Sequence, residues 1–171
     1  MLEAIEKLLI LQDRDRKIRR VEAELAHIEP ERHSLKAKSS AAQSQLDAAK
    51  QVLKQMEADR KRLELDVETK KTQIERYANQ QLQTRKNEEY RALAHEIETC
   101  KGDINKIEDE EIELMEKAEL TQKEVVRLTK EADAAKALTN DKVAALGQRE
   151  ENLKKELAEL KSIIEAKPAP S

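Results

Sequence analysis

The chain has few of the residues that build compact globular cores or interrupt helices. It contains no tryptophan or phenylalanine and two tyrosines, and its 171 residues include two glycines and three prolines. Aromatic side chains supply much of the buried area in globular cores, and glycine and proline mark turns and helix ends. The composition therefore argues against an ordinary globular domain and is typical of long helices and coiled coils.

Other absences indicate the cellular location of the protein. A single cysteine excludes an intramolecular disulfide. No apolar run approaches the roughly 20 residues that span a bilayer, and the N-terminus lacks a basic leader with a small-residue cleavage site. The net charge is only −3, so there is no global attraction to nucleic acid or anionic membranes. We expect a soluble, cytoplasmic protein without a membrane span.

What the chain does have is charge and a regular apolar repeat. Charged residues make up 40% of the chain, which is also typical of disordered proteins. A heptad repeat, however, buries one face of a helix against another helix, and a disordered chain has no reason to maintain it. The first heptad stripe comprises Ile18, Val21, Leu25, Ile28, Arg32, Leu35, Ser39, Ala42, Leu46, Ala49, Leu53, Met56, Arg60, Leu63, Val67, Lys70, Ile74 and Tyr77.

A second heptad stripe follows in a different frame. Continuing the first frame would place Glu88 and Arg91, instead of Tyr90 and Leu93, in the core. The second stripe comprises Tyr90, Leu93, Ile97, Cys100, Ile104, Ile107, Glu111, Leu114, Ala118, Thr121, Val125, Leu128, Ala132 and Ala135, and continues more weakly through Leu146, Leu153, Leu160 and Ile163. The frame change predicts that the chain folds back on itself. An alternative is a parallel dimer of one long helix, in which the break is a stutter.

The polar segment between the stripes places the turn within about residues 82–87. Asn87 is a suitable N-cap for the second helix, with Glu88 and Glu89 in its first turn. Such a tip pairs residue i with about residue 167 − i. Tyr77 then faces Tyr90 and closes the hairpin together with Leu93. The acidic stretch 103–119 faces the basic stretch 48–64.

Proline divides the predicted hairpin into two parts. Pro30 should kink or break the first helix, because proline removes a hydrogen bond and clashes with the preceding turn. It would face Ala137, close to the weakest part of the second stripe, residues 138–141. The predicted fold is therefore an all-α, long antiparallel coiled-coil hairpin that is kinked near Pro30. It has a distal part at 31–137, a basal part at 1–29 and 141–166, and a linker-like tail at 167–171.

No residue pattern predicts catalysis, a cofactor or a metal. His27, His33 and His95 lack the i, i+3 or i, i+4 spacing of a metal site. Cys100 occupies a heptad position, where it is expected to fill the core. There is no glycine-rich phosphate loop, and two paired helices form no deep pocket. We expect a protein that is not an enzyme and has no catalytic, cofactor-binding or metal-binding residues.

Two basic regions leave nucleic-acid binding open as the alternative function. One is the basic cluster, which consists of Arg14, Arg16, Lys17, Arg19 and Arg20, and the other is the mildly basic tip. A solvated helix face is the favoured interpretation, because aromatic residues that could stack on bases are absent apart from the tyrosines.

The tip segment resembles a known bacterial family. Residues 84–98 read TRKNEEYRALAHEIE, with an asparagine, Glu-Tyr, x-x-Leu and x-x-Glu-Ile in the family's order, and residues 8–15 read LLILQDRD, an apolar run ending in Gln-x-x-Asp. That family joins a coiled-coil hairpin to a C-terminal four-cysteine zinc ribbon. The resemblance covers about residues 1–166 and implies a hooked antiparallel hairpin that acts as a protein-binding adaptor.

The resemblance also suggests a cellular role. Some relatives are linked to flagellar or type III secretion and to regulation of transcription, and nucleic-acid binding has been considered for the family. This chain departs from the pattern, because it ends at Pro170-Ser171 with one cysteine. The ribbon was lost or removed, or this is a relative without one, and no zinc function is carried over.

The sequence thus predicts a non-enzymatic coiled-coil scaffold or adaptor that presents an elongated surface to a protein partner. The predicted partner-binding residues are Arg85, Lys86, Asn87, Glu88 and Glu89 at the tip, of which Glu88 and Glu89 first serve to cap the helix. Nucleic acid is the alternative partner, and self-association is compatible with the heptad pattern.

Overall fold

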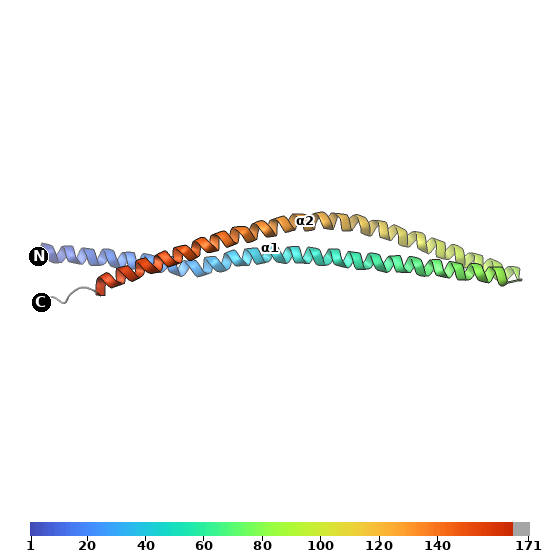
Figure 1. The fold of residues 1–171 in the computed structure, drawn as a ribbon, viewed down its shortest axis with the longest axis horizontal. Coiled ribbons are helices and arrows are strands. Elements are labelled where there is room, and N and C mark those ends of the chain that lie inside the picture. Colours follow the sequence, from blue (N-terminus) through green and yellow to red (C-terminus); the bar gives the residue numbers. More distant parts are fainter. Residues whose placement is uncertain (166–171) are drawn as a thin grey trace. The chain divides into compact units, whose positions relative to one another are not determined.

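A computed structural model shows two long helices joined by a short loop, and it describes residues 1–165. Helix α1 spans Leu2–Gln83 and helix α2 spans Asn87–Glu165, with residues 84–86 between them (Figure 1). No strand occurs within the described residues. The structure confirms the all-α antiparallel hairpin and a tip within residues 82–87. One helix running through the frame change, as in the parallel dimer, is excluded because α1 ends at Gln83.

The chain divides into two compact units, which are described separately here. The first contains Met1–Ser44 and the chain from Lys130 onward, and the second contains Gln45–Thr129. The division therefore differs from the predicted one near Pro30 and residues 137–141. The predicted tail 167–171, the end of the predicted basal part at residue 166 and the side chain of Ile163 lie outside what the structure describes.

Pro30 does not break α1, which runs through it without interruption. The missing N–H leaves the carbonyl of Ala26, four residues earlier, without its helical partner. Pro30 is exposed, so water can satisfy that carbonyl at little cost. The neighbouring heptad residues Ile28 and Arg32 keep their inward positions. The weak stretch 138–141 is likewise helical within α2.

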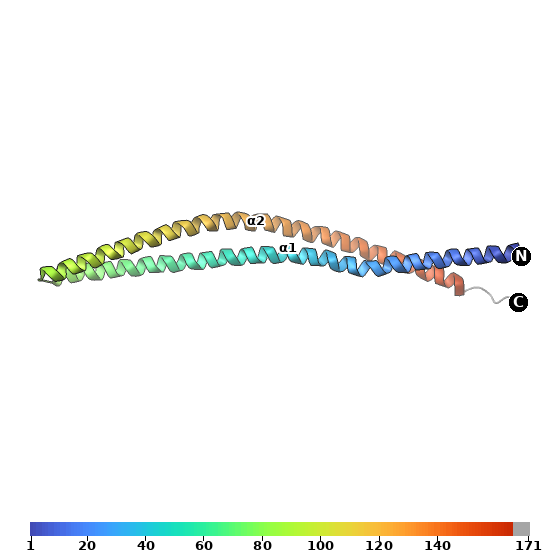
Figure 2. The same cartoon turned by 180° about the vertical axis from the view of Figure 1, so that it is seen from behind.

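The core of the first unit is a cluster of aliphatic side chains from both helices. Val21 and Ile28 of α1 pack with Leu153 of α2, whose side chain is the most buried of all at 1% exposure. Leu25, Leu146, Leu157 and Leu160 are half-buried around them. Val21, Ile28 and Leu153 belong to the predicted stripes, so the heptad pattern identified this core correctly. Figure 2 shows the two helices from the opposite side.

The second unit is also held together by heptad residues. Its buried side chains are Leu46, Val67, Cys100, Ile104, Val125 and Leu128. One predicted heptad residue of the first stripe departs from the pattern, because Arg60 is exposed and pairs with Glu64 of the same helix at 3.7 Å.

The helices pair in a different register from the predicted one. The thiol of Cys100 donates to Gln73 Oε1 at 3.7 Å, and Lys70 Nζ lies 3.3 Å from Asp103. The predicted partners were residue 94 for Gln73 and residue 97 for Lys70, so α2 is shifted by nearly one heptad. Both contacts join a stripe residue to a polar residue beside the other stripe, Gln73 or Asp103, and the spacing of apolar residues does not predict such contacts.

Removing the most buried side chain should destabilise the first unit strongly. We predict that Leu153→Ala lowers the free energy of unfolding by about 2–4 kcal/mol, because it deletes buried methyl groups and leaves a cavity. Urea unfolding followed by circular dichroism measures the change. The control is Leu138→Ala, at a position that is mostly exposed. Equal effects of the two substitutions would contradict the assigned core.

Candidate protein-interaction sites

Thr84 organises the tip of the hairpin. Its amide donates to the carbonyl of Gln80 at 3.0 Å, which continues the last turn of α1. Its hydroxyl donates to Glu89 Oε2 at 2.7 Å and lies 3.4 Å from the amide of Lys86 as an acceptor. One side chain therefore connects the end of α1 to the first turn of α2.

The N-cap of α2 is Lys86, one residue before the predicted Asn87. The carbonyl of Lys86 accepts the first helical hydrogen bond, from the amide of Tyr90 at 3.1 Å, and this defines the cap position. Asn87 is the first residue inside α2. Glu89, three residues after the cap, receives the Thr84 hydroxyl and lies 3.9 Å from Lys86 Nζ. The Thr84–Glu89 hydrogen bond joins the loop to the first turn of α2.

Polar contacts, and not a pair of aromatic rings, close the hairpin. Tyr77 is half-buried, whereas Tyr90 is 52% exposed. The side-chain amide of Gln81 donates to the carbonyl of Tyr90 at 3.2 Å, which joins the end of α1 to the start of α2. The predicted inward packing of Tyr90 is wrong, because the register is shifted. Leu93 is half-buried, as a closing residue should be.

The tip carries exposed apolar side chains as well as charge. Arg85, Lys86, Asn87 and Glu88 are exposed, as predicted for contact residues. Leu82 is 85% exposed in the last turn of α1. Sequence reasoning missed Leu82, because it lies off the heptad stripe in an otherwise polar segment and forms no pattern with its neighbours.

A shallow hollow accompanies these side chains. Its volume is about 470 Å³, and its lining residues are Gln80, Gln83, Thr84, Glu89, Ala92 and Leu93. The hollow combines amide, hydroxyl and carboxylate groups with two apolar side chains. It can accept a side chain of a partner, with hydrogen bonds at its rim.

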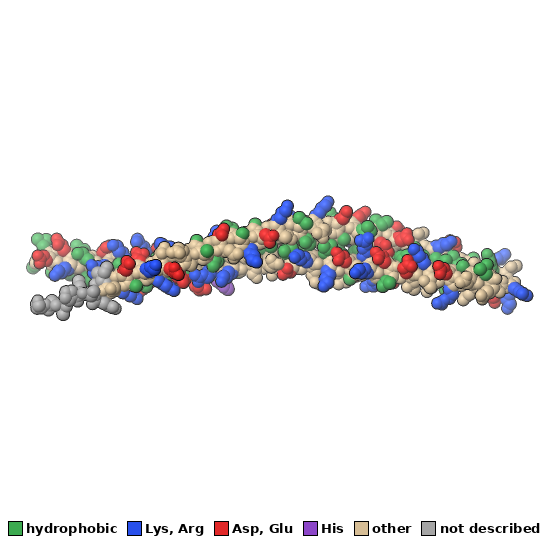
Figure 3. Space-filling model, viewed as in Figure 1, with side chains coloured by type: hydrophobic (Ala, Val, Ile, Leu, Met, Phe, Trp, Pro, Cys, Tyr) green, Lys and Arg blue, Asp and Glu red, His purple; other side chains and the backbone are tan. Residues whose placement is uncertain are grey.

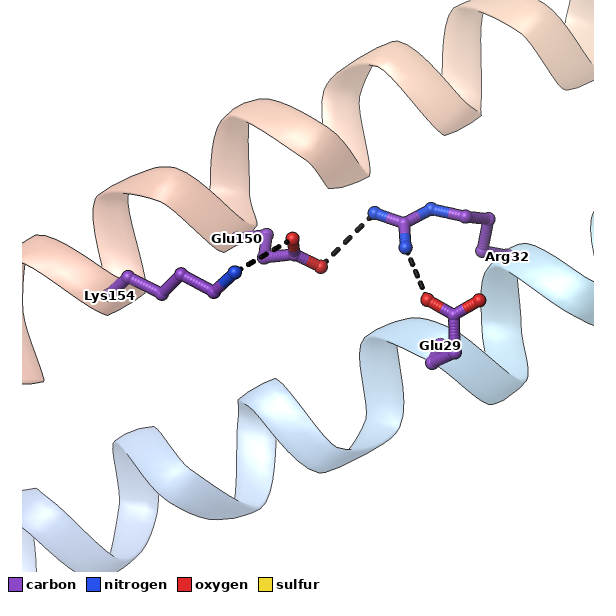
Figure 4. Close-up of polar contacts among 4 residues, drawn as sticks. All are labelled: Glu29, Arg32, Glu150 and Lys154. Carbon is purple, nitrogen blue, oxygen red and sulfur yellow. Dashed lines mark hydrogen bonds and ion pairs between the residues drawn. The ribbon is translucent and has the colours of Figure 1, made fainter.

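A charged group occupies the interface of the first unit (Figure 4). Arg32 of α1 lies at a heptad position with only 19% of its side chain exposed, and it pairs with Glu150 of α2 at 3.1 Å. Glu29 pairs with the same guanidinium, and Lys154 reaches Glu150 at 3.3 Å. The sequence predicted that Arg32 would reach acidic neighbours or fix the register, and the first of these is observed.

The group shifts the titration of its members. The hydrogen bond from Arg32, followed by that from Lys154, holds the pKa of Glu150 below its ordinary value of 4.5. The hydrogen bond to Glu150 raises the pKa of Arg32, with Glu29 adding to the effect against the cost of burial. Glu24–Arg149 at 2.6 Å and Glu22–Lys161 at 3.8 Å are further pairs between the helices of this unit.

The histidines and the basic cluster are the other candidate residues, and they form no metal site in the part of the chain that the structure describes. His27, His33 and His95 are exposed and separate, and no group of three His, Cys, Asp or Glu side chains could hold a metal within residues 1–165. Most of the basic cluster is exposed, and Lys17 pairs with Asp13 at 3.3 Å. Among the described residues, neither helix has an apolar stretch that could cross a bilayer.

Comparison with known families gives a match over most of the chain. Residues 11–167 match the model of the CT398-like coiled coil hairpin domain. Neither the curated proteins nor the solved structures include a match to this chain.

Removing the hydroxyl at the tip should destabilise the hairpin. We predict that Thr84→Ala costs about 1 kcal/mol in the free energy of unfolding, because the first turn of α2 loses a capping contact. Chemical unfolding measures the change. The control, Thr72→Ala, removes a hydroxyl that only bonds the Glu68 carbonyl of its own helix. A Thr84→Ala variant as stable as the wild type would contradict the capping role.

The charged group should make stability depend on acid. Because the pKa of Glu150 is lowered in the folded state, its ion pair contributes stability above about pH 4.5, and this contribution is lost as the pH falls through the lowered pKa. We predict that Glu150→Gln flattens the fall in melting temperature between about pH 5 and pH 2. The control, Glu151→Gln, removes an exposed neighbouring carboxylate and should keep the wild-type slope. Identical slopes for all three proteins would contradict this assignment.

Proposed function

The chain belongs to the family of CT398-like coiled coil hairpin domains, and from this premise we propose that it is a non-enzymatic adaptor that binds a protein partner at its tip. Two helices packed along heptad stripes form a scaffold whose surface is mostly helix face. At the loop of residues 84–86 the chain changes direction and exposes the side chains of Arg85 and Lys86.

The observation that carries the proposal is the exposure of apolar and basic side chains together at the tip. Leu82 and Tyr90 lie on either side of the loop in sequence, and both are more than half exposed. Arg85 and Lys86 are exposed between them. Tyrosine and arginine are among the residues that most often supply the binding energy in protein interfaces. The combination favours a partner with an apolar pocket and acidic residues at its edge.

The hollow beside the loop adds specificity to this surface. Thr84 and Glu89 line it, and their mutual hydrogen bond fixes its shape. The predicted contact residue Glu89 therefore serves first to hold the loop, while Arg85, Lys86, Asn87 and Glu88 remain available to a partner. A preorganised loop loses little conformational entropy on binding.

The process served is a further part of the proposal. The resemblance of the tip segment to a bacterial adaptor family supports a role related to secretion, the flagellum or transcription. We place that role in the cytoplasm, in line with the sequence prediction.

Substitutions at the tip should reduce binding without affecting the fold. We predict that Leu82→Glu, or Arg85→Ala together with Lys86→Ala, weakens capture of the partner on the order of tenfold or more, because each removes exposed contact groups. Immobilised full-length chain is incubated with lysate of the source organism, and bound proteins are quantified by mass spectrometry.

The matched control is Leu65→Glu, which adds a charge at another exposed leucine of the same helix. Circular dichroism verifies that each variant keeps its helical content. If both tip variants retain every protein that the wild type retains, the tip is not the binding site and the proposal fails.

A salt titration distinguishes the nucleic-acid alternative. Phosphate contacts by the basic cluster would give an association constant for RNA or DNA that falls steeply with salt. An adaptor for proteins should show little binding at any salt concentration. A steep slope that disappears when Arg16 and Arg19 become glutamine would favour nucleic acid over the protein partner.

A further inference from the structure

A second surface lies away from the tip, in the unit Gln45–Thr129. It is a groove of about 520 Å³ between the two helices. Leu53 and Met56 of α1 and Leu114 of α2 are half-buried in it, while Ile112 and Met115 are 55% and 44% exposed. Exposed apolar residues gathered along a groove are typical of a surface that another molecule covers.

The groove has a definite origin in the sequence. Arg60 occupies a heptad position, where an apolar side chain would otherwise fill the interface. Arg60 turns outward to Glu64 on its own helix, at 3.7 Å, and lines the groove from its edge. With no apolar side chain at that position, the aliphatic residues on either side remain partly uncovered.

The rim of the groove is acidic. Glu57, Glu116 and Glu119 line it and are exposed. Among the described residues none of the three forms an ion pair. Further along α2, Glu108, Asp109 and Glu110 are also exposed, again with no ion pair within residues 1–165. An apolar floor with unpaired carboxylates fits an amphipathic helix that carries basic residues.

The chain itself contains a helical segment, residues 2–20, in which an apolar part that carries Glu3, Glu6 and Lys7 is followed by basic residues interspersed with Asp13 and Asp15. Leu2, Ile5, Leu8 and Leu9 are each more than half exposed, and Ile5, Leu8 and Leu9 share one face of the helix by their spacing. Hydrophobic side chains reach the surface at this N-terminal end of α1 (Figure 3). The basic cluster, Arg14 to Arg20, follows directly.

We propose that the groove binds residues 2–20 of a second copy of the chain. The apolar part, residues 2–11, and the α2 side of the groove, residues 112–122, each extend roughly 15 Å as helix. If the segment runs antiparallel to α2, its basic cluster lies beside Glu108, Asp109 and Glu110. The opposite direction places the cluster beyond Gln122, away from this acidic run.

The contact joins two different surfaces, so it is heterologous and generates assemblies that grow with concentration. Opposite charges also make it sensitive to salt. These properties distinguish it from pairing of identical surfaces, in which one substitution affects both sides of the contact.

Sedimentation velocity of the full-length chain tests the proposal. We expect the wild type to associate increasingly with concentration and less at high salt. Met115→Glu in the groove and Leu8→Glu in the N-terminal segment should each weaken association roughly tenfold or more. Both positions are exposed, so the fold should persist, and circular dichroism verifies it. Leu65→Glu is the control and should associate like the wild type.

Mixing the two defective variants gives the decisive measurement. Each has lost a different side of the contact, so an equimolar mixture should form one-to-one complexes and nothing larger. A wild type that stays monomeric at all concentrations would overturn the proposal, as would a mixture that fails to pair. Association that Leu8→Glu abolishes but Met115→Glu leaves intact would show that the segment pairs elsewhere. Binding of the wild type to anionic phospholipid vesicles, without self-association, would assign the segment to a membrane surface instead.

Discussion

Burial of two heptad stripes against each other is the constraint on which every other feature of this protein depends. The aromatic residues of the chain are two tyrosines, and Tyr90 is exposed, so apolar burial comes mainly from aliphatic side chains at heptad positions. In each unit the buried residues come from both helices. An isolated helix gains little stability from propensity alone, and most helical stability in proteins comes from tertiary packing of one face. The tip is therefore needed for folding as well as for binding, because it must reverse the chain so that the second stripe faces the first.

The spacing of apolar residues was sufficient to predict which positions are buried and where the chain turns. It was not sufficient to predict which residue of one helix contacts which residue of the other. The stripes, the turn and the buried positions of Val21, Ile28 and Leu153 follow from spacing. The partner of each residue does not, since sliding one helix by a heptad leaves every heptad position inside. Pro30 does not interrupt α1, because it is exposed and water can replace the hydrogen bond that a proline lacks. At the tip, Asn87 was chosen as the N-cap by residue preference, whereas the carbonyl that accepts the first hydrogen bond of α2 belongs to Lys86.

Arg32 and Arg60 both stand at heptad positions where an apolar residue is expected. The charged residues around each arginine determine whether it stays in the interface. Arg32 remains in the interface of its unit because Glu150 on the other helix and Glu29 on its own helix surround its guanidinium. Arg60, in contrast, forms its ion pair with Glu64 on its own helix, and it is exposed. Arg32 therefore fills its position in the helix interface. Arg60 does not, and a groove with the exposed side chains of Ile112 and Met115 remains. The heptad pattern identifies both arginines as polar exceptions, but it does not predict which of them remains in the interface.

The same contrast explains how the register can be specified. A shift of one heptad in the first unit would bring Val143 or Leu157 to the place of Glu150, and Arg32 would lose its partner on α2. Breaking such a partly buried pair is costly, because the remaining charge stays desolvated. In the second unit, a heptad shift would replace Asp103 by Glu96 or Glu110, and Lys70 would still face a carboxylate. The Lys70–Asp103 pair is thus compatible with several registers, whereas the Arg32–Glu150 pair is compatible with one. Because single polar residues at core positions specify register in coiled coils, Arg32 is the residue through which this sequence distinguishes the observed pairing from its heptad-shifted alternatives.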